Sequence, residues 1–185
     1  MSPAFANPPQ PDQIVRIAAA DVIQELGSHG QDFDRNPDEL YRLVETRLAP
    51  HFDFESISEV ALGRFRGQAT PEQFDRFRTA FSKTLLRSYS GAMRGYRNER
   101  IDWQPARIGA DGSEAIVGFV LKRNDGSPPI PVSFRMHYRN DQWMVYDVAI
   151  ENIGLVSTYR SSFSQELKRN GIDGLTARLE SKLAD

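Results

Sequence analysis

The 185-residue chain has no cysteine, and this absence excludes disulfides, thiol catalysis and cysteine-ligated metal. It has no apolar run of about 18 residues either, so the sequence predicts no transmembrane helix. A basic excess is also missing, because 23 Lys and Arg oppose 25 Asp and Glu to give a formal net charge of −2. General binding to nucleic acid, which needs a surplus of cations for phosphate contacts, is therefore not expected.

The familiar catalytic and metal-binding motifs are absent as well. No G-x-S-x-G, P-loop or G-x-G-x-x-G pattern occurs, so the sequence carries no signal for the common hydrolases, NTPases and dinucleotide enzymes. The three histidines, His29, His51 and His137, have none of the spacings that place metal ligands on one face of an element. We therefore predict no metal site.

What is present is the composition of a globular domain, with 39% hydrophobic and 26% charged residues. We expect one domain over residues 11–185. Residues 1–10 contain three prolines and no periodicity, and we expect them to form a disordered lead-in. Within them Ala4-Phe5-Ala6 fits the A-x-A pattern that ends a secretory signal, which indicates the remnant of a cleaved signal peptide.

Apolar residues recur at helical spacing in four segments of the first half. Asn36-Pro37-Asp38-Glu39 and Thr70-Pro71-Glu72-Gln73 each present a cap, a proline at the first helical position and an acidic or amide residue three after the cap. Two further helices are expected at the end of the chain. The expected helices cover residues 11–26 with Gly27 as a stop, 37–49, 55–62, 71–89, 155–169 with Gly171 as a stop, and 174–183.

Between the two helical parts the period changes to two, which is typical of strands. Four β-rich runs, at residues 101–108, 115–122, 130–139 and 142–150, are separated by turn residues such as Asn140-Asp141. These runs predict a four-stranded antiparallel meander. Helices, then a sheet, then helices give the α+β class.

Large apolar side chains gather on three of these elements: the long fourth helix, one face of the sheet, and the helix that follows the last strand. Such stripes usually form a solid core. A curved sheet with helices across its concave side can also leave an apolar pocket, and periodicity does not decide between the two. The predicted lining of the pocket is Phe77, Phe81, Leu85, Tyr89, Val117, Phe119, Val132, Phe134, Met136, Tyr146, Val148, Val156, Tyr159 and Phe163.

A basic segment lies in the middle of the chain. Residues 63–100 contain nine Lys or Arg and three Asp or Glu, a local charge of +6, which leaves −8 for the remainder. Arg87, Arg94 and Arg97 gather near the end of the long helix. A solvated helix face is the plainer interpretation. The functional one is an anion site, since the planar fork of arginine suits phosphate, and these arginines would then form a head-group rim beside the pocket.

Two long segments resemble the MlaC family, also called toluene-tolerance or periplasmic phospholipid-binding proteins. The first runs from Trp143-Met144-Val145-Tyr146-Asp147-Val148 through Glu151-Asn152-Ile153-Gly154-Leu155-Val156 to Tyr159-Arg160-Ser161-Ser162-Phe163. The second is Ala61-Leu62-Gly63-Arg64 followed by Ala69-Thr70-Pro71-Glu72-Gln73 and Phe77. Both occur in the expected order, and the similarity extends from about residue 12 to 183.

The resemblance implies a periplasmic carrier that holds glycerophospholipid tails between a curved sheet, similar to that of nuclear-transport-factor-like domains, and helices. It implies no catalysis and no cofactor, with the phospholipid as cargo. It also implies exchange of lipid between an outer-membrane lipoprotein complex and an inner-membrane ABC transporter complex with a lipid-binding ring, and so a role in outer-membrane lipid asymmetry.

Two other functions are kept open. The first is an enzyme for a small hydrophobic substrate, with Asp147 beside Tyr146, or His51 with Asp53, as the general base. Asp147 has a simpler interpretation as a strand residue, facing away from the pocket and hydrogen-bonded to a neighbouring loop. The second is a docking module whose basic segment binds an acidic partner, which predicts a solid core and salt-sensitive binding.

Overall fold

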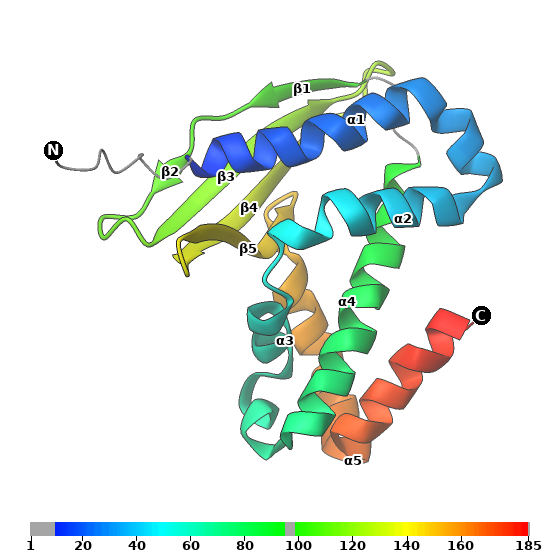
Figure 1. The fold of residues 1–185 in the computed structure, drawn as a ribbon, viewed down its shortest axis with the longest axis vertical. Helices are drawn as coiled ribbons and strands as arrows, with labels where there is room; N and C mark the ends of the chain where they lie inside the picture. The colour runs from blue at the N-terminus through cyan, green and yellow to red at the C-terminus, as the bar shows by residue number, and fades with distance from the viewer. Residues whose placement is uncertain (1–9, 95–98, 185) are drawn as a thin grey trace, which may run out of the picture.

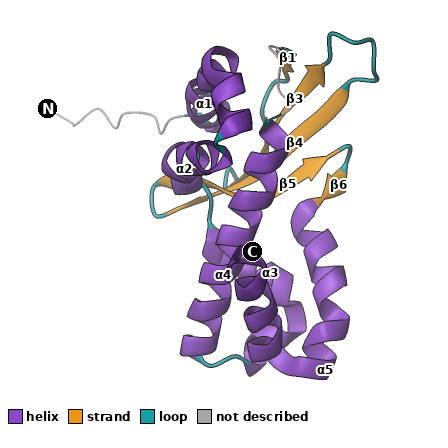
Figure 2. Cartoon of the chain, turned by 90° about the vertical axis from the view of Figure 1, so that its right-hand side faces the viewer, coloured by secondary structure: helices purple, strands orange, loops and turns teal. Residues whose placement is uncertain are grey.

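The computed structural model describes residues 10–94 and 99–184 and confirms the α+β class. A six-stranded antiparallel sheet lies at one end of the molecule and a group of helices at the other, with helix α1 across one face of the sheet (Figures 1 and 2). The described part begins at Gln10, so the predicted lead-in at residues 1–10 lies outside it except for that residue. The predicted rim residue Arg97 also lies outside the described residues.

The helices of the first half follow the predicted order. They are α1 (Pro11–Arg35), α2 (Pro37–Arg47), the 3-10 helix η1 (Ala49–His51), α3 (Phe54–Leu62), the 3-10 helix η2 (Gly63–Gln68) and α4 (Pro71–Met93). Thr70 and Gln73 form the expected capping box, with the Gln73 amide 3.2 Å from Thr70 Oγ1 and the Thr70 amide 3.0 Å from Gln73 Oε1.

Two predictions about helix ends were wrong. Gly27 does not stop the first helix, which continues to Arg35 and has its break at His29, where φ is −125°. Phe33 in this extension is buried and joins Leu26, Leu40 and Val44 in a small cluster, so tertiary packing outweighs the glycine signal. At the next helix Asn36 donates to the side chain of Glu39 at 2.8 Å, and its side chain does not cap the backbone.

The sheet contains β1 (Arg100–Trp103), β2 (Arg107–Ile108), β3 (Glu114–Lys122), β4 (Ile130–Arg139), β5 (Gln142–Ile150) and β6 (Ile153–Gly154). Its order is β1-β3-β4-β5-β6. Strand β2 pairs with the beginning of β3, whereas β1 pairs with its end. The four predicted strands are present, but the first is split into β1 and β2 around Pro105, which cannot donate to a ladder.

The short strand β6 was not predicted from the sequence. A turn at Glu151 and Asn152, both with positive φ, folds the chain back after β5 without glycine or proline at its corners. Asn140 and Asp141 also have positive φ, which is the geometry expected of the tight β4–β5 hairpin.

Helix α5 (Leu155–Ala184) consists of two arms that meet at Gly171, as the two predicted C-terminal helices require. Gly171 has φ 66° and ψ −171°, a region that essentially only glycine occupies. The first arm descends from the sheet beside α3 and α4, and the second rises again along α4 to the C-terminus (Figure 1). None of the helices in residues 10–94 and 99–184 is long and apolar enough to cross a membrane.

Candidate functional site

The sheet face that meets the helices is buried at one end by α1. Val15 of α1 packs against Ala115, Val117 and Met136, together with Trp143 and Val145, and all of these side chains are buried. We call this group the sheet cluster. Val117 and Met136, which the sequence placed in the pocket lining, are here part of a closed core with 0% exposure.

Farther along the same face the apolar side chains are only half-buried. The rings of Trp103 and Phe119 are 5.1 Å apart between centroids, and those of Phe119 and Phe134 are 6.0 Å apart. Phe134 pairs with Val148 across β4 and β5, and Val132 pairs with Phe119 across β3 and β4. These five residues form what we call the aromatic strip. It is an apolar surface that the protein's own side chains cover incompletely.

The helices enclose a second core. Phe77, Phe81 and Phe163 contact one another with centroids 5.3 to 6.1 Å apart. Leu85 and Val156 are buried in the same group, which we call the helical cluster. Phe77 and Phe81 have 0% exposure, so in this conformation they are core residues and do not line an open space.

Two tyrosines stand at the edge of the helical cluster. Tyr159 packs on Phe81 at 5.1 Å between ring centroids, and Tyr89 lies beside it, half-buried. Burial, followed by the charge and hydrogen bond of Tyr159, raises the pKa of Tyr89 to about 12, and the charge of Asp147 on β5 adds to the effect. The upper end of the helical cluster therefore lies close to β5.

The predicted lining residues thus fall into separate groups. Phe77, Phe81, Leu85, Tyr89, Val156, Tyr159 and Phe163 belong to the helical cluster or its edge, Val117 and Met136 to the sheet cluster, and Phe119, Val132, Phe134 and Val148 to the aromatic strip. Phe52, just before α3, packs against both clusters. Phe52 was not predicted as a lining residue because it stands outside the periodic runs. Trp103 lies in the predicted strand at residues 101–108 but was not included in the predicted lining.

Tyr146 is the exception, because a β-bulge moves it to the other face of the sheet. The register between β4 and β5 shifts at Arg135 and Met136, so Val145 and Val148 share a face across two intervening residues. Tyr146 stacks on His137 with centroids 5.0 Å apart, and His137 alternates with Met136 along β4. A pocket lined by Phe134 does not include Tyr146.

The suggested general bases have structural partners. Asp147 is buried, and its Oδ1 accepts hydrogen bonds from the amides of Val148 at 2.9 Å and Val156 at 3.2 Å. It thereby ties β5 to the first turn of α5. Its partners are an amide of its own strand and one of a helix, and not the neighbouring loop that its simpler interpretation named. Asp53 pairs with His137, Nε2 to Oδ2 at 2.8 Å, and not with His51.

Asp53 caps α3 and, through its contact with His137, connects this helix to β4. It accepts from the Ser56 amide at 2.9 Å and the Ser56 hydroxyl at 2.7 Å. Burial raises the pKa of Asp53, but the hydrogen bonds from Ser56 and His137 and the charge of His137 outweigh it and leave the pKa below its ordinary value. Within residues 10–94 and 99–184 no group of three acidic or histidine side chains is arranged to hold a metal.

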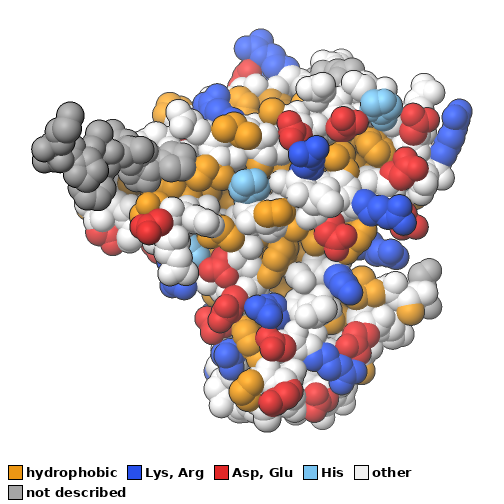
Figure 3. Space-filling model, viewed as in Figure 1, with side chains coloured by type: hydrophobic (Ala, Val, Ile, Leu, Met, Phe, Trp, Pro, Cys, Tyr) orange, Lys and Arg blue, Asp and Glu red, His pale blue; other side chains and the backbone are white. Residues whose placement is uncertain are grey.

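The basic segment is neutralised in large part by acids from elsewhere in the chain. Its ion pairs with acids outside the segment are Arg66 with Glu59, Arg76 with Glu180, Arg87 with Asp38, and Arg100 with Asp102, the last within β1. On the face seen in Figure 3, basic and acidic side chains are interspersed. The local charge of +6 in the sequence is therefore reduced by ion pairs in the fold and does not form a uniform basic surface on this face.

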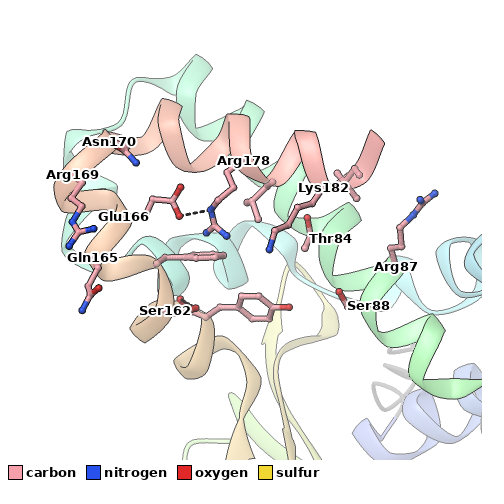
Figure 4. A pocket seen from close by; sticks show the side chains of 14 residues that line it. Thr84, Arg87, Ser88, Ser162, Gln165, Glu166, Arg169, Asn170, Arg178 and Lys182 are labelled. Carbon is pink, nitrogen blue, oxygen red and sulfur yellow. Dashed lines mark hydrogen bonds and ion pairs between the residues drawn. The ribbon is translucent and has the colours of Figure 1, made fainter. Parts of the chain in front are cut away.

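A cleft of about 840 Å³ opens between α4 and the two arms of α5 (Figure 4). Tyr159 and Leu183 contribute partly exposed apolar surface, and Thr84, Ser88 and Ser162 contribute hydroxyls. Phe163 and Leu179 also line the cleft but are buried. Its cations are Arg87, Arg169, Arg178 and Lys182. Of these, only Arg87 was predicted from the sequence, because the three others lie about ninety residues away. Arg178 and Lys182 reach α4 only through the turn at Gly171.

Comparison with known proteins identifies the family. A model of the family described as MlaC protein matches residues 16–181. This chain belongs to the MlaC family. It is 28% identical over 164 residues to the toluene tolerance protein ttg2D of Pseudomonas putida, covering 88% of this chain and 75% of that protein. It is 20% identical over 172 residues to the intermembrane phospholipid transport system binding protein MlaC of Haemophilus influenzae, covering 92% and 80%.

A solved structure of similar fold is the phospholipid-binding protein of Ralstonia solanacearum, which was determined in complex with a phospholipid. The TM-score is 0.84 at 30% sequence identity, and the alignment covers 96% of this chain and all of the other. The arrangement of helices and open sheet described above is therefore an MlaC-like phospholipid-binding fold.

The two segments that resemble the MlaC family in sequence meet in space. A Cβ added at Gly63, in the earlier segment, would lie 2.8 Å from Nε of Arg160 in the later one. The later segment also contains Asp147 and Gly154, whose ideal Cβ would be 3.1 Å from Asp147 Oδ2. These MlaC-like residues build the junctions that hold α3, β5 and α5 together.

Proposed function

We propose that this chain is a periplasmic phospholipid carrier that takes the acyl chains of a glycerophospholipid between the aromatic strip and the helices. The observation that carries the proposal is the half-buried aromatic strip, in a fold shared with a relative that was solved with a phospholipid. A side chain that packing leaves half-exposed on a concave face is surface available to an apolar ligand.

The energetics of tail transfer fit a carrier. Each methylene removed from water contributes about 0.8 kcal/mol, so roughly thirty methylenes on two acyl chains correspond to about 24 kcal/mol of gross transfer free energy. A free phospholipid therefore does not cross water at a useful rate. Exchange between a bilayer and a protein interior replaces one apolar environment with another, so loading and unloading need only a small net free energy.

The division into clusters shows how room for the tails could arise. The helical cluster and the sheet cluster are each tightly packed, and Phe52 packs against both. We propose that lipid entry moves the α4 and α5 helices relative to the sheet while each cluster stays intact.

The protein would act with membrane partners. We propose exchange with an outer-membrane lipoprotein complex and with an inner-membrane ABC transporter complex that has a lipid-binding ring, which contributes to outer-membrane lipid asymmetry. The name of the Haemophilus influenzae relative, an intermembrane phospholipid transport system binding protein, supports this assignment. No cofactor is needed, because the phospholipid is cargo.

An enzymatic function receives less support. The carboxylate of Asp147 accepts two backbone hydrogen bonds at the β5–α5 junction, and that of Asp53 caps α3. Each carboxylate thus has a structural role that explains its position without chemistry. We propose a carrier without catalytic activity.

Native mass spectrometry of the purified protein, followed by solvent extraction, tests the proposal. We expect a mass excess over the 21.0 kDa chain that corresponds to one or two phospholipids. A protein that is bare as purified and stays bare after incubation with phospholipid vesicles would refute lipid carriage. Vesicles without protein, passed through the same separation, control for lipid that co-purifies.

A further inference from the structure

The cleft between α4 and the C-terminal arm of α5 is a chemically mixed site. Its walls carry four cations, Arg87, Arg169, Arg178 and Lys182, and one acid, Glu166, so its local charge is +3 (4 − 1) in a chain of net charge −2. The partly exposed Tyr159 and Leu183 provide the apolar part, whereas Phe163 and Leu179, which also line the cleft, are each only 2% exposed. The volume of about 840 Å³ is within the range of small-molecule sites.

Two of the cations face the space between the helices. Figure 4 shows Arg178 and Lys182 projecting from the C-terminal arm of α5, with Thr84 and Ser88 of α4 across from them. Arg178 uses Nε for its ion pair with Glu166 Oε2, at 2.5 Å, which leaves its terminal nitrogens as further donors. Among the residues that the structure describes, Lys182 has no acidic partner.

The other two cations, Arg87 and Arg169, lie at the two ends of the cleft. Arg87 lies at 3.6 Å from Asp38 and over the ring of Tyr41, and in Figure 4 it stands apart from Lys182 on α4. Arg169 lies beside Gln165 at the opposite end. The centre of positive charge is therefore at Arg178 and Lys182, directly beside the hydroxyls of α4.

We propose that this cleft binds a phosphate group that carries an aliphatic chain, with Lys182 and the free nitrogens of Arg178 as donors and the partly exposed Tyr159 and Leu183 against the part of the chain nearest the phosphate. Arginine and lysine together suit phosphate, since one supplies a directed fork and the other a compact charge. The hydroxyls of Thr84 and Ser88 add polar contacts of the kind that phosphate oxygens accept.

The proposal deepens the carrier function and rests on it in one respect, that the natural ligand is a phospholipid. It places the phosphate on the side of the helices, next to the Tyr159 and Phe163 wall that the cleft shares with the helical cluster. It also replaces the rim expected from the sequence, Arg87, Arg94 and Arg97, with residues of the C-terminal arm.

Calorimetric titration of the delipidated full chain with octyl phosphate tests the site, with inorganic phosphate and octanol as separate probes. We expect octyl phosphate to bind more tightly than either, and its affinity to fall as salt is raised. Lys182→Gln should weaken octyl phosphate binding by about tenfold or more, as the loss of a charged hydrogen bond predicts. The matched control is Lys168→Gln on the exposed side of the first arm, which should leave the affinity unchanged.

A second variant guards against an indirect effect through folding. Arg178→Lys keeps a cation for Glu166 but removes the fork, and we expect weaker octyl phosphate binding with an unchanged unfolding midpoint. Amide resonances of residues 84, 88 and 162 should shift on titration, ahead of those of residues 119 and 134. Unchanged affinity in both variants, or shifts confined to residues 119 and 134, would overturn the proposal.

The probes also distinguish the sources of phosphate. Equal affinity for inorganic and octyl phosphate would overturn the aliphatic part and indicate a free-phosphate site. Equal affinity for octanol and octyl phosphate would overturn the phosphate part. Failure of the carrier function shows instead in the lipid extraction described above, because a protein without extractable phospholipid can still bind octyl phosphate at this cleft.

Discussion

At Gly63 the chain leaves α3 with φ 52° and ψ −125°, and the side chain of Arg160 lies directly over the position a Cβ would take. The positive φ favours glycine for backbone reasons, and a Cβ at this position would also displace the Arg160 side chain. Gly67, four residues later in η2, has no atom within 4 Å of its ideal Cβ and no positive φ. The two glycines thus form a matched pair for measurement.

We predict that Gly63→Ala lowers the free energy of unfolding by about 1 to 3 kcal/mol, because it adds backbone strain and displaces Arg160. Gly67→Ala should change it by less than about 0.5 kcal/mol. Urea unfolding of both variants checks this. Equal midpoints for the two variants would show that Arg160 moves aside without cost and that the positive φ is tolerated.

The Asp53 carboxylate should make the free energy of unfolding depend on pH in the acid range. Because its folded pKa lies below the ordinary value, its contribution is fully present above the unfolded pKa of about 4 and is lost as pH falls through the folded pKa. Asp53→Ala should cost about 1 kcal/mol at neutral pH through loss of the α3 cap. We expect this difference from the wild-type protein to shrink below about pH 4.

Unfolding midpoints at several pH values, with Asp75→Ala as the control, measure the effect. Asp75 is on the exposed side of α4 and, among the residues that the structure describes, pairs only with Arg78 in its own helix, at 2.9 Å. A pH-independent cost for Asp53→Ala would mean that the shape of the residue matters and its charge does not.

At the scale of elements, the junction between β5 and α5 is the main connection of sheet to helices. Asp147 supplies the link, since its Oδ1 accepts from one amide of its own strand and one of the helix. Ser157 and Thr158 add bonds from their hydroxyls to the Gly154 carbonyl at 2.8 and 2.9 Å. Positions of Tyr159 and Phe163 follow from this junction, one and two turns farther along the helix.

We predict that Asp147→Ala destabilises the protein by about 1 to 3 kcal/mol, because the buried Val156 amide loses its acceptor. Asp147→Asn keeps an oxygen at the same place and should recover part of the loss. Chemical unfolding of both variants, together with extraction of bound phospholipid, checks the prediction. If Asp147→Asn retained full stability and full lipid content but abolished a turnover measured on a hydrophobic substrate, the enzymatic hypothesis would take precedence.

At the scale of the whole molecule, the apolar residues divide between packing and binding. The helical and sheet clusters are closed, whereas the aromatic strip, beside the sheet cluster, is half-exposed. Replacement of a residue in a cluster should therefore act mainly on stability. Replacement in the strip should act mainly on lipid content.

We predict that Phe81→Ala costs about 3 to 5 kcal/mol of stability, the usual range for a large buried aromatic. Phe134→Asp should cost less than that and yet remove most of the bound phospholipid, because it places a charge against the acyl chains. Lipid-to-protein ratio and urea midpoint, measured on both variants, give the comparison. Ile108→Asp, at a side chain that is 48% exposed, controls for added charge.

Full lipid content in Phe134→Asp would contradict the assignment of the strip to the acyl chains. Loss of lipid in Ile108→Asp as well would point to a general effect of negative charge on membrane encounter, and the strip would lose its special role.

Much of the fold was predictable because its signals are local. The capping box at Thr70, the turn residues Asn140 and Asp141, and the break at Gly171 each depend on neighbours in sequence, and each has the predicted geometry. Gly27 failed as a stop because Phe33, beyond it, gains burial in contact with α2. Here a long-range packing energy outweighed a local preference of about 1 kcal/mol.

For the candidate site, the sequence determined which side chains are apolar and on which elements they lie, since composition and period are properties of the chain itself. Only the tertiary structure decided which of them close into cores, as Phe77 and Phe81 do, and which stay half-exposed, as Phe119 and Phe134 do. It also moved Tyr146 across the sheet through a bulge, dispersed the basic segment into ion pairs, and brought Lys182 opposite α4. Burial, register and charge pairing depend on contacts between residues far apart in sequence, so no local pattern encodes them.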